Sequence, residues 1–283
     1  MVNNFDLGKL VHKGKVKDIY EADNNNLIFH FTDRISAFDI ILPSTIPQKG
    51  EILCKFANFW FETLDMPNHL IKVIDKDKIL VKKLEIIPIE CVVRGYLYGS
   101  LFERVKKKEV EFNSEIILAS KLSSPMFDPT TKFELKDRPI LQEEIIKKGW
   151  LTKEEINQLK EYSIKLYMKM SKVVLKAGFI MADVKFEFGK DQNGKILLAD
   201  SIGPDEFRLW NKKKYMIGKN QEAFDKQIVR DWLIEVGYKK KVDEDRKNGL
   251  KDSIPPQLSE EIILKVRDRY IYTYEKITGR IFD

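Results

Sequence analysis

The strongest constraint on the fold is a strictly alternating stretch, Met181–Gly189, which reads Met-Ala-Asp-Val-Lys-Phe-Glu-Phe-Gly. Asp183, Lys185 and Glu187 occupy alternate positions, and apolar residues lie between and beside them. Successive side chains of a β-strand point to opposite faces, so this pattern predicts a strand with one charged and one apolar face.

A second apolar segment, Lys195–Asp200, follows closely, and Asn193-Gly194 between the two runs is a strong hairpin signal. If these two residues form a two-residue turn, Glu187 lies directly opposite Asp200. Like charges so placed destabilise a sheet, and a Mg²⁺ ion that also touches a phosphate would compensate. The alternatives are a solvated charged face, or a longer loop that shifts the register and separates the two acids.

The composition describes a globular protein with 283 residues, of which 43% are hydrophobic and 33% charged. The net charge is +6, but both signs are interspersed, which favours anionic ligands weakly and does not indicate nucleic-acid binding. No apolar run approaches the roughly 18 residues of a membrane span, and the N-terminus lacks a signal-peptide core, so we expect a cytoplasmic protein. Cys54 and Cys91 lie in apolar surroundings, which predicts buried thiols in a reducing compartment.

The first ninety residues favour β-structure. Leu10–Tyr20 alternates around Gly14, and Leu27–Thr32 is predicted to be a second strand. Three lysines of the first segment would share one face: Lys13, Lys15 and Lys17. A glycine beside lysines in a strand-turn-strand unit is suited to hold phosphate, because backbone N–H groups can approach closely while ammonium groups neutralise charge. The alternative is a set of lysines that are only solvated.

The next segments predict a helix, a strand and an interrupted strand, at Ile52–Thr63, Lys78–Lys83 and Ile86–Arg94. Pro88 interrupts the last of these and favours an edge position or a connector between lobes. The sequence Arg94–Ser100 (Arg-Gly-Tyr-Leu-Tyr-Gly-Ser) offers a guanidinium and a hydroxyl that can bind phosphate, although an ordinary glycine-containing turn would read the same way.

Lys121–Ile140 contains three prolines and predicts a long irregular loop, a kind of segment that is often functional. A helix is predicted from Thr152, with Glu155 at the capping-box spacing and Gly178 at the end, and it delivers the chain onto the alternating strand. Arg208 lies in a later turn-rich segment, and its side chain could point back toward the charged face of the alternating strand. The tail predicts two amphipathic packing helices joined by a charged linker: Asp225–Val236 and Ser259–Thr278.

Eight segments then occur in a characteristic order and spacing: Gly14–Glu21, Asp33–Asp39, Ile46–Gly50, Val92–Ser100, Ala182–Gly189, Ala199-Asp200, Pro204–Trp210 and Asp225–Trp232. Together they resemble the phosphoribosylaminoimidazole-succinocarboxamide synthase (SAICAR synthetase) family of purine biosynthesis. No single segment is specific, but the ordered set is, and it extends from about Leu7 to Gly279.

The resemblance implies an ATP- and Mg²⁺-dependent ligase that joins L-aspartate to the carboxylate of carboxyaminoimidazole ribonucleotide (CAIR), giving SAICAR, ADP and phosphate through an acyl phosphate. It implies an α+β fold in two lobes: a small antiparallel β lobe, residues 1–88, and a larger α/β lobe, residues 89–283, with ATP in the cleft. The expected partners are these small molecules, without nucleic acid or membrane, and the expected state is a monomer or homodimer.

The resemblance also implies roles for single residues. Nucleotide contacts are implied at Lys15, Lys17, Lys82, Ile86, Glu187 and Asp200, the last two also binding the metal. Asp183 and Lys185 would face the imidazole, with Lys185 neutralising the carboxylate under activation. The remaining substrate contacts are Asp39, the phosphate clamp of Arg94, Ser100 and Arg208, and the loop residues Lys132, Asp137 and Arg138.

Two regions depart from the family's usual pattern. Ser201 stands where the family often has glutamate, and Gly203 where it has serine or threonine, which puts a second metal or amine contact in doubt. The middle loop usually continues with His-Asp-Glu-Asn, whereas here it reads Lys-Asp-Arg-Pro over residues 136–139. We expect this loop to close over aspartate, with Lys132 or Arg138 pairing a substrate carboxylate.

Two other functions fit parts of the sequence. A small-molecule kinase of the inositol-phosphate type would share the nucleotide lysines and the metal hairpin, but the set Arg94, Ser100 and Arg208 argues against it. A basic nucleic-acid-binding module is disfavoured by the interspersed acids and the lack of any recognised nucleic-acid motif.

Overall fold

The structure is a computed structural model that describes residues 7–134 and 137–283, so Lys136 of the middle loop lies outside the described residues. The chain divides into two compact units. Unit 1 comprises Met1–Leu84 and Asp225–Asp283, and unit 2 comprises Glu85–Phe224. The division therefore differs from the predicted one at residue 88, because the C-terminal helices pack with the N-terminal segment.

Unit 1 contains an antiparallel five-stranded sheet in the order β1-β2-β3-β7-β6. The strands are β1 (Lys9–Lys13), β2 (Lys17–Asp23), β3 (Asn26–Phe31), β6 (Leu70–Asp75) and β7 (Lys78–Lys82). Gly14 begins a reversal between β1 and β2, and its N–H donates to the Lys17 carbonyl at 2.8 Å. The predicted common face for Lys13, Lys15 and Lys17 is wrong, because the chain turns back between them.

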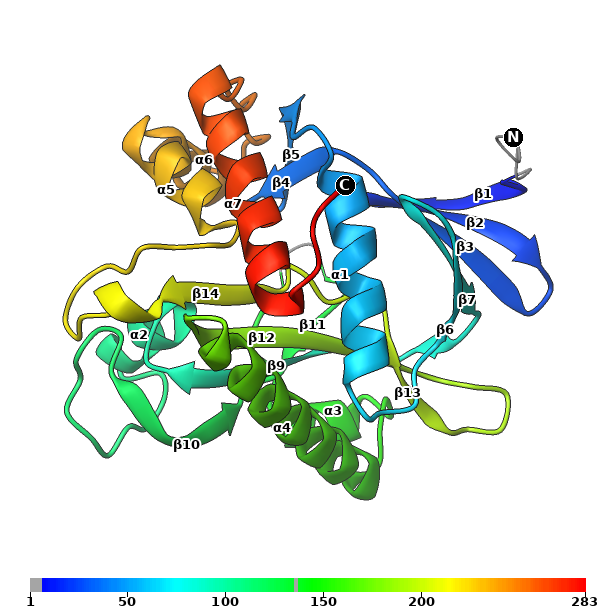
Figure 1. The fold of residues 1–283 in the computed structure, drawn as a ribbon. Helices are drawn as coiled ribbons and strands as arrows, with labels where there is room; N and C mark the ends of the chain where they lie inside the picture. The colour runs from blue at the N-terminus through cyan, green and yellow to red at the C-terminus, as the bar shows by residue number, and fades with distance from the viewer. Residues whose placement is uncertain (1–6, 135–136) are drawn as a thin grey trace. The chain divides into compact units, whose positions relative to one another are not determined.

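The helices of unit 1 explain why the two ends of the chain pack together. Helix α1 (Lys49–Thr63) contacts strands β3, β6 and β7, and α7 (Glu260–Thr278) lies beside α1 (Figure 1). The rings of Phe56 and Tyr274 meet edge to face at 5.3 Å between these helices. Both helices were predicted, as was α5 (Gln227–Glu235).

One helix of unit 1 lies in the predicted charged linker. Helix α6 (Tyr238–Lys247) buries only Tyr238 and Val242, so its sequence carries almost no apolar periodicity. Unit 1 also contains a two-stranded hairpin of β4 (Arg34–Ala37) and β5 (Ile40–Thr45).

Unit 2 is built on a seven-stranded sheet in which β12 (Phe179–Lys190) is the longest strand and pairs with four others. The main path runs β10 (Lys121–Phe127), β9 (Ile89–Tyr96), β12, β13 (Ile196–Ala199), with β8 (Glu85–Ile86), β11 (Thr130–Thr131) and β14 (Phe207–Asn211) beside it. Val184, Phe186 and Phe188 are buried, as the alternation predicts. The interruption predicted at Pro88 is present, since this residue separates β8 from β9, but the expected irregular loop 121–140 contains β10 and β11.

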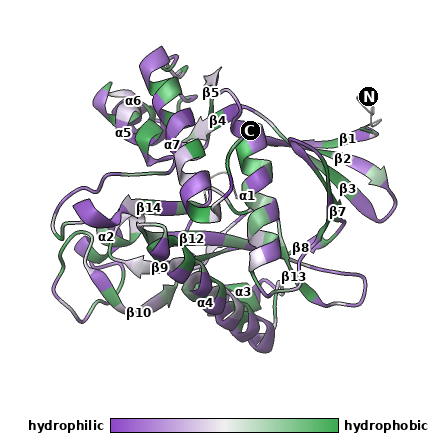
Figure 2. Ribbon diagram, viewed as in Figure 1, coloured by the Kyte–Doolittle hydropathy of each residue, from purple (hydrophilic) through white to green (hydrophobic). Residues whose placement is uncertain are grey.

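Helix α4 (Lys153–Lys176) covers this sheet and contacts β9 and β12. The predicted capping box is present: Thr152 Oγ1 accepts from the Glu155 N–H at 3.1 Å, and the Thr152 N–H donates to Glu155 Oε2 at 2.9 Å. The helix carries both hydrophilic and hydrophobic residues (Figure 2), consistent with one buried face. The short helices of unit 2 are α2 (Gly99–Lys106), α3 (Gln142–Lys147) and η1 (Lys212–Lys214).

The hairpin of β12 and β13 forms, but in a different register from the predicted one. Glu187 pairs with Ala199, so the expected pairing with Asp200 is wrong by one residue. The cause is a longer turn: the Asp191 N–H donates to the Lys195 carbonyl at 3.0 Å, and Gly194 adopts a positive φ of 76°. Asp200 lies just beyond β13 with a φ of 62°, so strand alternation no longer fixes its direction.

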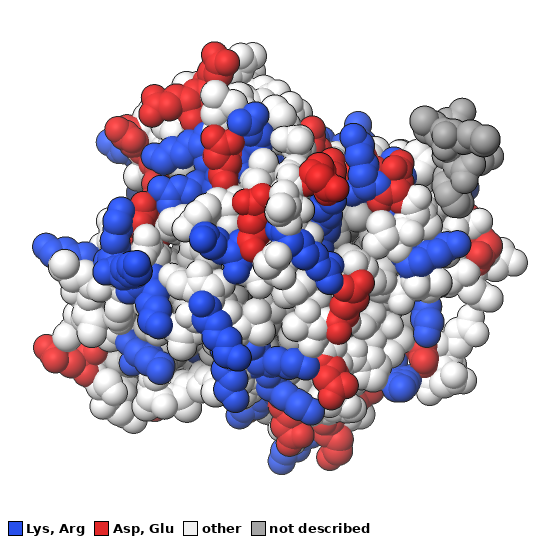
Figure 3. All heavy atoms as spheres, viewed as in Figure 1, with Lys and Arg blue, Asp and Glu red and all other residues white. Residues whose placement is uncertain are grey.

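Three further observations concern surfaces and burial. On much of the face shown in Figure 3, basic and acidic side chains lie next to one another. Among the described residues, no helix has both the length and the apolarity to cross a membrane. Cys54 and Cys91 are buried as predicted, and burial raises the pKa of each thiol to about 12.

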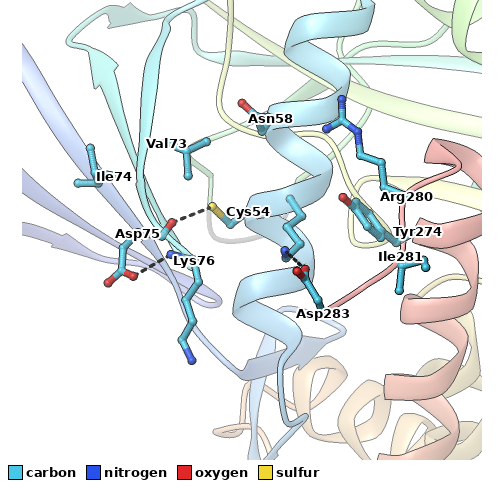
Figure 4. A pocket seen from close by; sticks show the side chains of 11 residues that line it. Cys54, Asn58, Val73, Ile74, Asp75, Lys76, Tyr274, Arg280, Ile281 and Asp283 are labelled. Atoms are coloured by element: carbon cyan, nitrogen blue, oxygen red, sulfur yellow. Dashed lines mark hydrogen bonds and ion pairs between the residues drawn. The ribbon is translucent and has the colours of Figure 1, made fainter. Parts of the chain in front are cut away.

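A crevice of about 570 Å³ lies in unit 1 between α1, β6 and the segment after α7 (Figure 4). It is lined by Cys54, Lys55, Asn58, Val73, Ile74, Asp75, Lys76, Tyr274, Arg280, Ile281 and Asp283. None of the predicted site residues lines it. Two of its cations already have partners, since Lys55 Nζ lies 3.1 Å from an Asp283 carboxylate oxygen and Arg280 lies 3.0 Å from Glu62. We assign it no catalytic role.

Candidate active site

The charged face of β12 carries a compact group of opposite charges in unit 2. We call Lys132, Lys185, Glu90 and Glu187 the lysine–glutamate cluster. Lys185 Nζ lies 2.6 Å from Glu90 Oε1 and 3.7 Å from Glu187 Oε1, while Lys132 forms an ion pair with Glu187. Both glutamates are buried. The two ammonium groups balance the two carboxylates, which makes burial of these charges tolerable.

Strand pairing brings this cluster together. Phe186 of β12 pairs with Cys91 of β9, so Glu90 is the next residue along β9 and can reach Lys185 across the strands. The Thr130 hydroxyl of β11 donates to the other oxygen of Glu90 at 2.9 Å and fixes the carboxylate from its far side.

The protonation state of Lys185 follows from these neighbours. Burial alone lowers the pKa of an ammonium group, but the charges of Glu90 and Glu187 and the hydrogen bond to Glu90 raise the pKa of Lys185 by more, so the net shift is upward. Lys185 is therefore a cation at neutral pH. It can neutralise charge on a reacting group, but it cannot accept a proton.

A second group of charges lies along the same sheet. We call Arg94, Arg104, Arg208, Asp128 and Asp183 the arginine cluster. Arg94 Nε donates to Asp128 at 2.5 Å, and Arg104 forms an ion pair with the same carboxylate. Asp183 lies 2.9 Å from Arg208 and 3.7 Å from Arg94. Three guanidinium groups and two carboxylates leave one positive charge, which favours an anionic ligand.

The register of the sheet explains this second cluster as well. Asp183 of β12 pairs with Arg94 on β9 at one side and with Arg208 on β14 at the other. The aspartate therefore lies between two arginines from neighbouring strands. Burial raises the pKa of Asp128, but the charges of Arg94 and Arg104 lower that pKa by more, so this carboxylate is ionised at neutral pH.

Arg208 and Ser100 are held by the chain between β9 and α2. The Arg208 guanidinium lies over the Tyr98 ring, 5.0 Å from its centroid, and Gly99 leaves room for it, since a Cβ there would lie 2.7 Å from Arg208 Nη1. Ser100 stands in the first turn of α2, and its hydroxyl accepts from Arg94 at 3.1 Å. The N-terminus of α2 adds to a site suited to phosphate.

The predicted phosphate-binding lysines lie in unit 1. Lys15 Nζ donates to Asp39 at 2.5 Å, and Lys17 Nζ lies 4.7 Å from the centroid of the Phe29 ring. Asp39 and Phe38 form the turn between β4 and β5 with positive φ values of 68° and 54°. Burial raises the pKa of Asp39, but the hydrogen bond and charge of Lys15, together with the charges of Arg246 and Lys226, lower that pKa by more, so the pair is ionic at neutral pH.

The other predicted residues fall outside both clusters. Lys82 ends β7 in unit 1 and is exposed, whereas Ile86 belongs to β8 of unit 2 and pairs with Gly189. These two predicted nucleotide contacts therefore flank the point, between Leu84 and Glu85, where the chain passes from one unit to the other. Arg138 lies 2.9 Å from Glu134 and 2.5 Å from Glu144. Asp137 is partly buried in the same loop.

Sequence reasoning missed Glu90, Arg104 and Asp128. A signal for Glu90 existed, because a lone carboxylate inside the apolar run 86–94 must be paired if it is buried. Asp128 lies between two prolines in a segment read as irregular, and nothing in its spacing indicated that two arginines would reach it.

Comparisons with known proteins identify the family of this chain. The family model described as SAICAR synthetase matches residues 10–246. The chain belongs to the SAICAR synthetase family. A phosphoribosylaminoimidazole-succinocarboxamide synthase of Nitrosopumilus maritimus is 51% identical over 269 residues, covering 94% of this chain and 97% of the relative. The name denotes a ligase of purine biosynthesis, so the ligase prediction is confirmed and the kinase alternative is not favoured.

Solved SAICAR synthetase structures confirm the predicted α+β fold. The SAICAR synthase of Saccharomyces cerevisiae complexed with SAICAR superposes with a TM-score of 0.83 at 31% identity, covering 100% of this chain and 98% of that one. A type-2 SAICAR synthetase in complex with ADP gives a TM-score of 0.74 at 27% identity, covering 96% and 99%.

Proposed function

We propose that this member of the SAICAR synthetase family activates the carboxylate of CAIR with ATP and joins it to L-aspartate through the lysine–glutamate and arginine clusters of unit 2. The observation that carries the proposal is the charged face of β12, where Asp183 belongs to the arginine cluster and Lys185, two residues along, belongs to the lysine–glutamate cluster. A phosphate anchor and a carboxylate-activating cation thus lie on one strand face.

The arginine cluster is assigned to the phosphate of CAIR. Arg94 and Arg208 can offer planar N–H pairs to phosphate oxygens, and Ser100 adds a hydroxyl. Asp183 holds both arginines in place, and its second role is to face the imidazole ring. The SAICAR complex of the yeast relative supports a ribonucleotide ligand for this fold.

Lys185 is assigned to the carboxylate that is activated. The terminal phosphoryl group of ATP passes to a CAIR carboxylate oxygen, giving an acyl phosphate and ADP. The aspartate amine then attacks the acyl carbon, the C–O bond to phosphate breaks, and inorganic phosphate leaves. A permanent cation at Lys185 offsets the charge that accumulates on these oxygens. The amine must lose a proton to a base, and the raised pKa of Lys185 excludes it from that role.

Nucleotide contacts are assigned to Lys15 and Lys17, with Lys82 and Ile86 in the segment beside the adenine. The ADP complex of a relative supports a nucleotide ligand. Among the described residues, no group of three or more His, Cys, Asp or Glu side chains is arranged to hold a metal ion. Mg²⁺ in nucleotide sites usually takes only one or two carboxylates with phosphate oxygens. We keep Glu187 and Asp200 as the residues that would hold the ion, and Glu187 would then have to exchange its pairing with Lys132 and Lys185 for the metal. When bound, it would neutralise phosphate charge.

Of the remaining predicted contacts, we keep some, reassign one and leave the others as predictions. Lys132 already pairs with Glu187 and is assigned to a carboxylate of L-aspartate. Lys132 belongs to the lysine–glutamate cluster, whereas Arg138 pairs with Glu134 and Glu144 outside both clusters, so among the loop residues we favour Lys132 over Arg138. Asp137 stays a prediction. Asp39 is assigned to holding Lys15. ATP in a cleft between two lobes, a cytoplasmic location and a monomer or homodimer also stay predictions.

The test is a reaction with ATP, Mg²⁺, CAIR and L-aspartate, together with four mixtures that each omit one component. We expect ADP and SAICAR in equal amounts in the complete mixture and neither product when any component is absent. A phosphorylated product made without L-aspartate would instead identify a kinase. The control protein is Lys185→Met, which keeps the length of the side chain but removes its charge and should abolish turnover.

A further inference from the structure

The turn that carries Lys15 is held from one side by two residues outside the predicted site. Arg34 Nη2 donates to the Gly14 carbonyl at 3.0 Å, and Arg34 Nε donates to the Lys15 carbonyl at 3.4 Å. The Val16 carbonyl accepts from the Thr32 N–H at 3.0 Å and from the Thr32 hydroxyl at 2.8 Å. Three consecutive carbonyls of the turn are therefore bound.

Arg34 is itself fixed in position. Its Nη2 lies 2.6 Å from Asp18 Oδ1 and its Nη1 lies 3.1 Å from Asp18 Oδ2, which is a bidentate pair. Asp18 is buried on β2, and Arg34 begins β4, so both backbones are anchored in regular structure. Such a planar pair leaves the guanidinium little freedom to rotate.

The direction of the bound carbonyls has a consequence for the opposite side of the turn. A trans peptide unit is planar, and its C=O and N–H groups point in opposite directions. The carbonyl of Gly14 shares a peptide unit with the N–H of Lys15, and the carbonyl of Lys15 shares one with the N–H of Val16. Both N–H groups therefore point away from Arg34.

We propose that Arg34, locked by Asp18, is a positioning residue that turns the N–H groups of Lys15 and Val16 outward so that they bind the phosphates of the nucleotide together with the lysine ammonium groups. The proposal rests on the assignment of Lys15 and Lys17 to the nucleotide. Successive backbone N–H groups presented by a turn form a recognised anion-binding arrangement. Four of the five side-chain N–H donors of Arg34 are used by Asp18 and the turn, so Arg34 acts through the turn and not on the ligand.

Lysine cannot take the place of Arg34. Its single ammonium group would have to serve a bidentate carboxylate and two carbonyls at once, whereas the guanidinium provides separate N–H groups in a fixed plane. The variant Arg34→Lys keeps the positive charge but removes the guanidinium that binds the Gly14 and Lys15 carbonyls of the turn. It therefore separates a requirement for geometry from a requirement for positive charge.

The experiment measures calorimetric dissociation constants of adenosine and ADP for the wild type, Arg34→Lys and Arg267→Lys. The last is a matched control, because Arg267 lies on α7 and pairs with the neighbouring Asp268. We expect Arg34→Lys to bind ADP about tenfold more weakly, as for loss of a few oriented hydrogen bonds, while adenosine affinity stays within about twofold. The control should bind both ligands like the wild type.

A purely structural role for Arg34 would weaken both ligands equally, and an unchanged ratio of the two constants would overturn the proposal. If Arg34→Lys does not fold, Asp18→Asn decides in its place: it weakens the bidentate pair that fixes Arg34 and should weaken ADP alone, by about threefold. If the wild type does not bind ADP, the nucleotide assignment itself is wrong. If Lys15→Met loses ADP binding while both positioning variants bind ADP normally, the nucleotide assignment stands and only the proposal for Arg34 is overturned.

Discussion

Replacing Glu90 with glutamine changes one charge in the lysine–glutamate cluster and almost nothing else. The amide has the same shape, and its oxygen can still accept from Lys185 or Thr130. What is lost is the negative charge 2.6 Å from the Lys185 ammonium group.

The expected cost follows from the contacts. The Lys185 ammonium group stays charged in this variant, so only the Thr130 hydrogen bond changes from a charged to a neutral one. A hydrogen bond to a charged group contributes about 1.5–3 kcal/mol and a neutral one about 0.5–1.5 kcal/mol, so this change costs roughly 1–2 kcal/mol. The uncompensated charge of Lys185 adds to this, but Glu187 remains 3.7 Å away and the side chain of Lys185 is 31% exposed, which limits the addition. We expect the free energy of unfolding to fall by about 2 kcal/mol.

The kinetic effect should be larger for turnover than for nucleotide binding. Glu90 orients Lys185, and misplacing a catalytic group by about 1 Å can cost on the order of a hundredfold in rate. We expect kcat to fall between about tenfold and a hundredfold, while the KM for ATP changes less than about twofold. Because Glu187 still faces Lys185, the lysine stays a cation and no new pH dependence should arise near neutrality.

Urea unfolding and steady-state kinetics of Glu90→Gln test these values. Glu161→Gln is the matched control, because Glu161 is an exposed glutamate on α4 and its substitution should leave stability within about 0.5 kcal/mol. If Glu90→Gln behaves like this control in both assays, Glu90 does not position Lys185 and the cluster has been misread.

Three further predictions concern other parts of the molecule. Arg208→Lys should raise the KM for CAIR by at least about tenfold and leave the KM for ATP unchanged, because lysine cannot bind Asp183 and a phosphate in one plane. Equal changes in the two KM values would argue against the phosphate clamp. Arg138→Ala should leave the KM for L-aspartate within about twofold, since two glutamates already occupy the arginine, and a large rise would restore it as a substrate ligand. Burial raises the pKa of Asp77, but His30 and Lys78 lower it by more, to about 2. This carboxylate therefore stabilises the fold above about pH 4 and loses that effect as the pH falls toward 2. Asp77→Asn should lower the free energy of unfolding in urea by about 1–2 kcal/mol at neutral pH and by progressively less below pH 4. A difference between variant and wild type that does not change with pH would refute the lowered pKa of Asp77.

Local patterns predicted much of the fold. The alternation around Lys185 gave the correct strand and the correct buried face, and the capping box at Thr152 gave the start of α4. The helix α6 escaped prediction because a polar helix with two buried residues has no apolar period to detect. These signals depend only on residues close together in the chain, so they predict single strands and helix ends where such a pattern exists and miss an element such as α6 where it does not.

The candidate site could be predicted only in part, because its assembly depends on register. The ordered segments pointed to Asp183, Lys185 and Arg208, whose roles stay predictions. The hairpin turn is longer by one residue than expected, and this separates Glu187 from a position opposite Asp200. Glu90 enters the site from β9 only through the pairing of that strand with β12. No local pattern specifies which residues of distant strands become neighbours.

The central claim is that ATP activates the CAIR carboxylate as an acyl phosphate before L-aspartate attacks. The most direct test uses CAIR whose carboxylate oxygens are both ¹⁸O and measures the label in the phosphate that is released. The account predicts one labelled oxygen in each phosphate molecule, because the C–O bond breaks when the amine displaces phosphate. Unlabelled phosphate released together with SAICAR would contradict the acyl phosphate and the role assigned to Lys185.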